Sequence, residues 1–308
     1  MSPKDWARLV RLPNLPTPLA DIGLGLSASL ALGQRVTPVA VLLVAAGSVC
    51  LYAAGMVLND WCDHREDALT RPERPIPSGV IQAPTALLAG LALLVLGVLF
   101  PGLTALVSDI RPNPGAIATC LAGLILVYDA WAKHTPLGPL AMGACRGMNV
   151  LLGASAGGFS LPADFSVLLL PAAAATLYIA GVTWFARTEE KTSNPLHLRA
   201  ATLVIGTGLA LAACTPFFIP AGFEKPAGLL LSVGLMGLLL WMLLPKLLRA
   251  NRERTPRSVQ SAVGWMIALY IPLQASQATG LVGPWGLLIL PLFGLVLLLR
   301  RWRWLKAT

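Results

Sequence analysis

Ten long apolar stretches dominate this chain, and each is close to the roughly 20 residues that an α-helix needs to cross the hydrocarbon core of a bilayer. Only 12% of the 308 residues are charged and 56% are hydrophobic, whereas a water-soluble domain carries about 25% charged residues. This composition excludes a soluble globular enzyme and a disordered chain. The sequence therefore predicts an all-α, polytopic membrane protein with spans at 15–32, 37–59, 84–104, 113–131, 138–157, 165–187, 199–219, 227–248, 258–279 and 282–300.

Basic residues are distributed unevenly between the two sides of such a bundle. With the N-terminus in the cytoplasm, the outer side receives only Arg35, Arg111 and Lys225, and the other 20 of the 23 Lys and Arg residues lie on or near the cytoplasmic side. This positive-inside pattern favours an even number of spans and cytoplasmic termini. It also explains the net charge of +9, so we expect no nucleic-acid partner. We expect one membrane domain over residues 1–308, in a bacterial inner membrane.

The most polar connection in the chain follows the second expected span. If that span continues as a helix, Asp60, Asp63 and Asp67 share one face within about 60° of arc. Neighbouring carboxylates repel one another, and a divalent cation relieves the repulsion; oxygen ligands favour Mg²⁺. Arg71 and Arg74 follow within reach and can donate paired hydrogen bonds to a phosphate group. The residues alone leave two interpretations, a site for Mg²⁺ and a phosphate-bearing substrate or a solvated acidic helix end.

A longer motif contains this cluster. It reads Asn-Asp-x-x-Asp-x-x-x-Asp from Asn59 to Asp67, followed by Arg-x-x-Arg-Pro-Ile-Pro-Ser-Gly from Arg71 to Gly79. The motif resembles the first signature of the UbiA superfamily of intramembrane prenyltransferases. The resemblance implies a helical bundle, usually of nine spans, around a central cavity, with Mg²⁺ and a prenyl diphosphate donor. Because the chain has a tenth expected span, we expect nine to ten.

The resemblance also implies roles for the residues of this motif. Asn59, Asp60 and Asp63 would bind Mg²⁺, which neutralises the diphosphate. Asp67 would either position the diphosphate or deprotonate the acceptor. Charge that develops on the departing diphosphate would be stabilised by Arg71, Arg74 and Lys133.

Tyr128 and Lys133 match a second family feature, a tyrosine followed five residues later by a lysine at the end of the fourth span. Lys133 would place a compact positive charge where the diphosphate docks, and Tyr128 would contact the substrate. Without the resemblance, Lys133 is equally well one of the basic residues that ordinarily follow a span. Asp129, beside Tyr128, is expected to face water.

Two polar residues interrupt the fifth expected span. A charged side chain within a membrane is costly unless it faces a cavity or a partner, so we expect Arg146 and Asn149 to line the cavity beside the diphosphate or acceptor. The alternative is a hydrogen bond between helices. Asn14, at the entry to the first span, is a further substrate-binding candidate. The spacing Gly143-x-x-x-Gly147 predicts close helix packing.

The second acidic motif of the family is altered in this chain. Members carry Asp-x-x-x-Asp at the end of the sixth span, where this chain has Arg187, Glu189 and Glu190 and no aspartate. We expect Glu190 to offer a carboxylate to Mg²⁺, with Glu189 as a second candidate ligand and Arg187 as a substrate contact. Alternatively, Arg187 pairs with Glu190. The departure resembles the EboC-like branch of the superfamily and leaves open whether a second metal binds.

Together these features predict an integral-membrane, Mg²⁺-dependent prenyltransferase that moves an isoprenyl group from a prenyl diphosphate to a lipophilic acceptor. Its active site would open to the cytoplasmic side, and the bundle would contact membrane lipid. The sequence does not indicate the acceptor. The alternative belongs to a different class of function, a non-catalytic membrane protein that binds or moves a lipid-linked metabolite on the same scaffold. The altered second motif favours this alternative, and the intact first motif opposes it. An ion-coupled transporter would need carboxylates near mid-membrane, where the sequence offers Asp21.

Overall fold

The computed structural model describes residues 2–107, 113–159, 165–188, 192–218 and 225–301. Within these ranges the regular elements are helices. The α-helices are α1 (Pro3–Leu9), α2 (Pro16–Ala31), α3 (Pro38–Thr70), α4 (Ala83–Gly102), α5 (Pro114–Ala130), α6 (Gly138–Ala154), α7 (Phe165–Ala186), α8 (Pro195–Cys214), α9 (Lys225–Glu253), α10 (Pro256–Val282) and α11 (Leu290–Arg300).

Local sequence explains where several of these helices begin. Proline opens α2, α3, α5, α8 and α10, and it suits a first helical position because its fixed φ is helical and its missing N–H would have had no partner there. Side chains at the preceding position accept a hydrogen bond from a backbone N–H of the first turn, which is the usual stabilisation of a helix start. These N-cap residues are Thr37, Asn113, Asn194 and Thr255.

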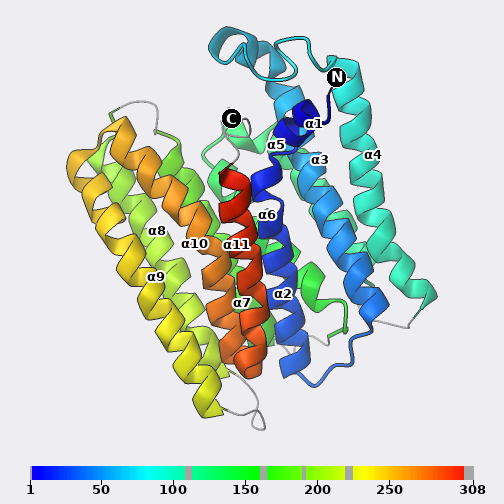
Figure 1. Cartoon of the computed structure of the whole chain (residues 1–308), viewed down its shortest axis with the longest axis vertical. Helices are drawn as coiled ribbons and strands as arrows, with labels where there is room; N and C mark the ends of the chain where they lie inside the picture. Colours follow the sequence, from blue (N-terminus) through cyan, green and yellow to red (C-terminus); the bar gives the residue numbers. More distant parts are fainter. Residues whose placement is uncertain (1, 108–112, 160–164, 189–191, 219–224, 302–308) are drawn as a thin grey trace.

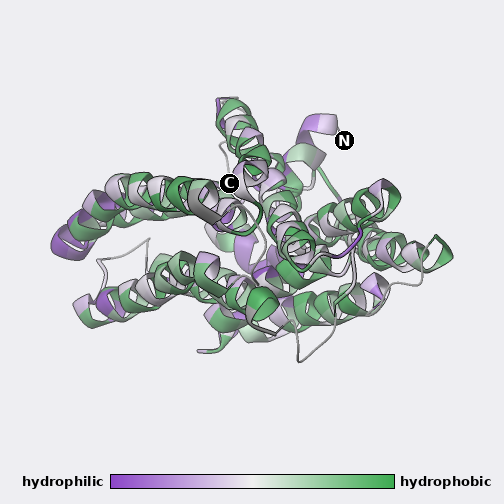
Figure 2. Cartoon of the chain, turned by 90° about the horizontal axis from the view of Figure 1, so that it is seen from below, coloured by the Kyte–Doolittle hydropathy of each residue, from purple (hydrophilic) through white to green (hydrophobic). Residues whose placement is uncertain are grey.

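Each of the ten expected spans overlaps one of the helices α2 to α11, although α3 continues to Thr70, beyond the expected end at 59, and α11 begins at Leu290 instead of 282. Six helical stretches among the described residues are long and apolar enough to cross a membrane, and α5 is a shorter apolar helix. Large apolar side chains such as Leu42, Leu88 and Trp241 are between 69% and 74% exposed, and hydrophobic residues cover the outer faces of the helices (Figure 2). An apolar exterior of this kind fits lipid rather than water. The chain is thus a multi-pass integral membrane protein, as the composition predicts.

The helices form a bundle with α3 and α4 on one side, α8 and α9 on the other, and α2, α6 and α7 between them (Figure 1). Helix α2 packs against both α6 and α10, and α6 packs against α7. Helix α11 runs back to the end of the bundle that holds α1 and packs against the short 3₁₀ helix η1 (Leu12–Asn14). This return agrees with an even number of passes.

Glycines bring the backbones of the central helices into contact. A Cβ atom at Gly143 in α6 would overlap the carbonyl oxygen of Thr176 in α7, and one at Gly153 would overlap the backbone of Ile22 in α2. Small residues allow this approach, and in lipid the resulting van der Waals packing holds helices together. The close packing predicted from the Gly143-x-x-x-Gly147 spacing is therefore present between α6 and α7.

Replacing Gly143 by alanine is expected to destabilise the protein by about 1–3 kcal/mol, because the added methyl group forces α6 and α7 apart. The matched control is Gly123→Ala in α5, where a Cβ would meet open space and alanine favours the helix by about 0.5–1 kcal/mol. Melting temperatures in detergent micelles should therefore fall for Gly143→Ala and stay level or rise for Gly123→Ala. Equal melting temperatures would contradict the close contact.

Candidate functional site

The acidic motif lies on the last turns of α3, because this helix continues for 33 residues, to Thr70. Asp60, Asp67 and Arg74 are buried, and Arg74 lies between the two carboxylates. Its Nη1 atom is 2.7 Å from Oδ2 of Asp67 and 3.5 Å from Oδ1 of Asp60. Arg11 directly precedes η1, and its Nη2 atom is 3.3 Å from the same Oδ1 atom of Asp60. Two arginines from different segments thus compensate this pair of carboxylates.

Asp63 points to a different partner. Its Oδ1 atom is 2.6 Å from Nζ of Lys133, which lies in the 3₁₀ helix η3 (Ala132–His134). The same ammonium group donates to Oδ1 of Asn59 at 3.2 Å. The expected single face of three carboxylates is therefore divided between two basic partners, although all three carboxylates stay on one end of α3.

Most of these residues line a polar pocket at the end of the bundle, but the buried Asp60 does not. Arg71 and Thr70 also line it, together with Tyr128 from α5. The pocket brings together seven residues predicted from the sequence, namely Asn59, Asp63, Asp67, Arg71, Arg74, Tyr128 and Lys133. Sequence reasoning missed Arg11, Glu66 and His134 as lining residues. No spacing rule could find Arg11, which reaches Asp60 across 49 positions of the chain.

The oxygen atoms of Asn59, Asp60, Asp63 and Asp67 are the hard ligands that Mg²⁺ prefers. In the described part of the chain, however, no three acidic, histidine or cysteine side chains are placed to hold a metal ion together. This donor set fits Mg²⁺ bound jointly with a phosphate group, since Mg²⁺ is commonly held by one or two carboxylates plus substrate oxygens. It does not fit a metal held by the protein alone.

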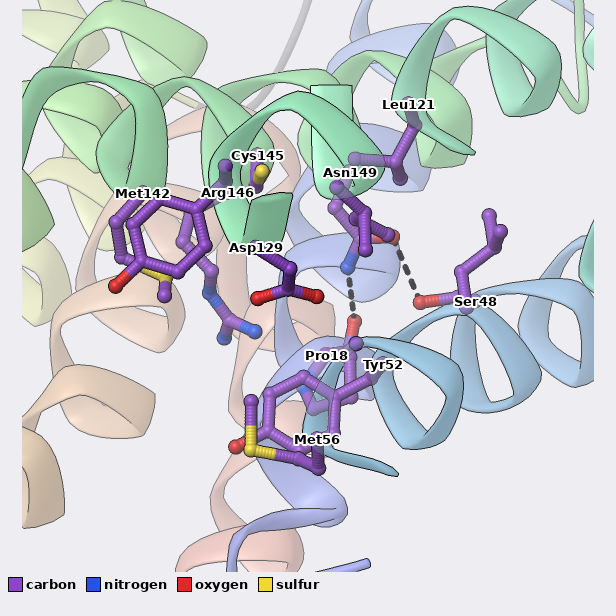
Figure 3. Close-up of a pocket in the computed structure, with 14 residues that line it drawn as sticks. Pro18, Ser48, Tyr52, Met56, Leu121, Asp129, Met142, Cys145, Arg146 and Asn149 are labelled. Carbon is purple, nitrogen blue, oxygen red and sulfur yellow. Dashed lines mark hydrogen bonds between the residues drawn. The ribbon is translucent and has the colours of Figure 1, made fainter. Parts of the chain in front are cut away.

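An apolar cavity adjoins the polar pocket, and Tyr128 lines both. Helices α2, α3, α5 and α6 supply its walls. Leu51, Met56, Leu121 and Ile125 are among the lining residues, and Asp129, Arg146 and Asn149 contribute polar groups (Figure 3). A charged pocket that leads into an apolar chamber can accommodate a ligand with one charged and one hydrocarbon end.

Arg146 and Asn149 line this cavity and also join three helices. Nη2 of Arg146 is 3.1 Å from Oδ2 of the fully buried Asp21 in α2, and Nδ2 of Asn149 donates to the same oxygen at 3.1 Å. Tyr270 and Gln274 from α10 both donate to Oδ1 of Asp21 at 2.6 Å. The geometry therefore satisfies both sequence-based alternatives, a polar cavity wall and hydrogen bonds between helices. Substrate contact by Arg146 and Asn149 stays a prediction.

Aromatic rings complete the surroundings of the Arg146 guanidinium. Its central carbon lies 4.9 Å from the ring centroid of Tyr270 and 5.7 Å from that of Tyr52. Such cation–π contacts gain strength where water is excluded. Asp21, the mid-membrane carboxylate of the transporter alternative, is thus engaged by a cation and three hydrogen-bonding groups.

The remaining predicted residues lie elsewhere. Asn14 ends η1 and lines neither the polar pocket nor the apolar cavity. Arg187 donates to the backbone carbonyl oxygens of Thr135 and Lys133, so it anchors the loop that carries Lys133. Glu189 and Glu190 lie outside the described residues, and metal binding by either stays a prediction.

Asp129 departs from the sequence-based expectation. It was expected to face water, yet it is only 3% exposed. It lies in the last turn of α5, and its carboxylate points into the apolar cavity (Figure 3). The reason is tertiary, because α5 packs against α3 and α6 and these helices enclose its end.

A family model described as "UbiA prenyltransferase family" matches residues 22–263. The chain belongs to the UbiA prenyltransferase family. A digeranylgeranylglyceryl phosphate synthase of Methanosarcina mazei is 39% identical over 123 residues, which is 40% of each chain. One from Methanoregula boonei is 32% identical over 187 residues, or 59% of this chain and 63% of the relative. This chain thus aligns with less than two thirds of these two relatives.

Solved structures of UbiA homologues share the fold. The apo homologue from Aeropyrum pernix K1 superposes with a TM-score of 0.65 at 20% identity, over 87% of this chain and 97% of the other. A homologue from Archaeoglobus fulgidus bound to DMAPP and Mg²⁺ has a TM-score of 0.61 at 15% identity, over 89% and 99%. The UbiA-like helical bundle predicted from the first motif is therefore confirmed, and a UbiA homologue binds Mg²⁺ and a prenyl diphosphate.

Proposed function

We propose that this UbiA-family chain is a Mg²⁺-dependent prenyltransferase that moves an isoprenyl group from a prenyl diphosphate to a lipophilic acceptor. The observation that carries the proposal is the junction of the polar pocket with the apolar cavity at Tyr128. A prenyl diphosphate has a multiply charged head and a hydrocarbon tail. The two adjoining chambers match these two ends.

Binding of the diphosphate would change the partners of the basic side chains in the polar pocket. Arg74 and Lys133 are paired with the α3 carboxylates, and they would turn to the diphosphate oxygens, as would Arg11 and Arg71. Asn59, Asp60 and Asp63 would hold Mg²⁺, which supplies positive charge that makes the diphosphate a better leaving group. Asp67, fixed by Arg74 at 2.7 Å, would keep that arginine oriented toward the donor.

The apolar cavity would receive the reacting carbon. When the C–O bond of the donor breaks, the electron pair leaves with the diphosphate, and the allylic cation needs surroundings from which water is excluded. The aromatic faces of Tyr52 and Tyr128 lie in the cavity wall and would stabilise such a cation. The names of the relatives denote a glyceryl phosphate with two geranylgeranyl groups, which makes glyceryl lipids the first acceptors to test.

A donor-cleavage assay tests this proposal. The purified full chain in lipid nanodiscs is incubated with labelled geranyl diphosphate, and diphosphate release is measured with Mg²⁺ and with EDTA. We expect release with Mg²⁺ and none with EDTA. Tight donor binding without release, across several prenyl chain lengths, would favour the non-catalytic alternative.

We also propose that the polar pocket opens to the cytoplasm of a bacterial cell. Arg11, Arg71, Arg74 and Lys133 line the polar pocket at that end of the bundle, and α11 returns to the same end as α1 (Figure 1). A reporter inserted at the exposed Gly79 and one fused after Thr308 should both give cytoplasmic signals, whereas one inserted at Gly33 should give an external signal. Opposite signals at Gly79 and Thr308 would leave an odd number of passes.

A further inference from the structure

One polar group in the cavity wall has no partner. Asp129 is 97% buried, since its exposed fraction is 3%, and its Oδ2 atom has no hydrogen-bond partner among the described residues. Its nearest basic candidate is otherwise engaged, because Lys133 bonds to Asp63 and Asn59. The carboxylate points into the space between α3 and α6 (Figure 3).

Two other polar side chains of the cavity wall are held by partners. Asn149 accepts from Ser48 at 2.7 Å and donates to the carbonyl oxygen of Pro18 at 3.0 Å, and Arg146 is paired with Asp21. Among the buried side-chain oxygen and nitrogen atoms of this wall, Oδ2 of Asp129 is thus the one without a hydrogen-bond partner in the described part of the chain. A ligand group that donates a hydrogen bond is the natural partner of this carboxylate.

Asp129 is unfavourable for the stability of the fold on three separate grounds. A buried carboxylate loses its hydration, and one without a partner gains nothing in return. Asp129 also occupies the last turn of α5, where the helix dipole disfavours negative charge. Ionisable residues placed at such cost within a membrane protein mark functional sites.

The position of Asp129 defines which reacting atom it would meet. It follows Tyr128, which lines both the polar pocket and the cavity, so its carboxylate lies on the cavity side of the junction. A donor with its diphosphate in the polar pocket places its reactive carbon at this junction. An acceptor that occupies the cavity would therefore bring its nucleophilic atom close to both Asp129 and that carbon.

We propose that Asp129 binds the hydroxyl group of the acceptor and takes its proton during transfer, so that the acceptor is a lipophilic alcohol and the product an ether. This inference rests on the proposed prenyl-transfer function. The C–O bond of the donor breaks, and its electron pair leaves with the diphosphate. A lone pair of the acceptor oxygen forms the new C–O bond to the allylic carbon. The O–H proton passes to the carboxylate of Asp129 and then to water.

The test compares Asp129→Asn with the unsubstituted chain, using geranyl diphosphate as donor and hexadecylglycerol as the alcohol probe. Asparagine keeps the shape and removes the proton acceptor, so ether formation should fall by about 100-fold or more, the usual contribution of a general base. Mg²⁺-dependent binding of the donor should stay close to parental, because the diphosphate is held in the polar pocket, which Asp129 does not line. The melting temperature should stay level or rise, because a buried charge is removed.

Two controls sharpen the comparison. Glu73→Gln removes an exposed carboxylate in the loop after α3 and should leave ether formation unchanged. Hexadecylglycerol with both hydroxyls methylated offers no O–H group and should neither react nor bind. Asp129→Glu should recover part of the ether formation with a displaced pH profile, which a merely structural role would not produce.

Each other outcome overturns the inference in a recognisable way. Ether formation by Asp129→Asn at the parental rate would show that Asp129 does not handle the acceptor. Loss of donor binding in parallel with ether formation would place Asp129 in the diphosphate site. Donor cleavage by the unsubstituted chain without any use of the alcohol would reject an alcohol acceptor while leaving prenyl chemistry intact. Absence of donor cleavage would contradict the proposed function itself.

Discussion

Replacing Asp63 by asparagine is expected to weaken Mg²⁺-dependent binding of geranyl diphosphate by about 100-fold, or about 2.7 kcal/mol. Asp63 faces the polar pocket, bonds to Lys133 at 2.6 Å and keeps 23% of its side chain exposed. Its loss removes a metal ligand and releases Lys133 from its position, while the core stays intact. Donor binding is measured by titrating Mg²⁺ at a fixed donor concentration.

Asp60→Ala should abolish donor binding as well, but with a lower melting temperature. Asp60 is buried between Arg11 and Arg74, so its removal leaves two arginines with fewer partners. Glu73→Gln, at an exposed position between Arg71 and Arg74, is the control for a lost carboxylate. Parental donor affinity in Asp63→Asn and Asp60→Ala alike would mean that the cluster is a solvated helix end.

Replacing Arg146 by methionine is expected to destabilise the protein by about 3–5 kcal/mol, the cost of breaking a buried ion pair from one side. Asp21 is fully buried and would lose its only charged partner among the described residues. Methionine retains most of the side-chain volume, so the effect reports the uncompensated charge and not a cavity. Melting temperatures in detergent micelles measure the change.

A matched arginine provides the control. Arg249 pairs with Glu253 at 2.7 Å on an exposed helix face, where such a pair contributes about 0.3–0.5 kcal/mol. Arg249→Met should therefore shift the melting temperature little. Combining Arg146→Met with Asp21→Asn should recover part of the loss, because the neutral amide keeps hydrogen-bonding capacity without the buried charge. A double variant as unstable as Arg146→Met would show that charge compensation is not the reason for the pair.

Membrane spans and the first motif are the parts of this protein that short-range sequence patterns can predict. A span depends on the apolarity of a continuous stretch, so ten stretches that overlap α2 to α11 could be placed, with the ends of α3 and α11 the least accurate. The motif from Asn59 to Gly79 depends on helical spacing and on a turn rich in proline, both of which are local. The distribution of Lys and Arg predicts which side of the membrane this motif faces.

Side-chain partners could not be predicted in this way. Asp60, Asp63 and Asp67 have the spacing of a common face, but their division between Arg74 and Lys133 depends on where η3 and the turn after α3 lie. Asp129 is the clearest example. Its position at a helix end suggests exposure to water, and only the packing of α5 against α3 and α6 encloses it.

By itself, therefore, the sequence determined a multi-pass helical bundle of the UbiA type with an acidic, Mg²⁺-suited motif at one end, because hydrophobicity and helical periodicity act over neighbouring residues. Only the tertiary structure decided that Arg11 reaches Asp60, that Asp21 on α2 meets Arg146 on α6 and Tyr270 on α10, and that the carboxylate of Asp129 lies unpartnered in the apolar cavity. These contacts join residues between 49 and 249 positions apart, and they exist because apolar helices pack in an order that no single segment specifies.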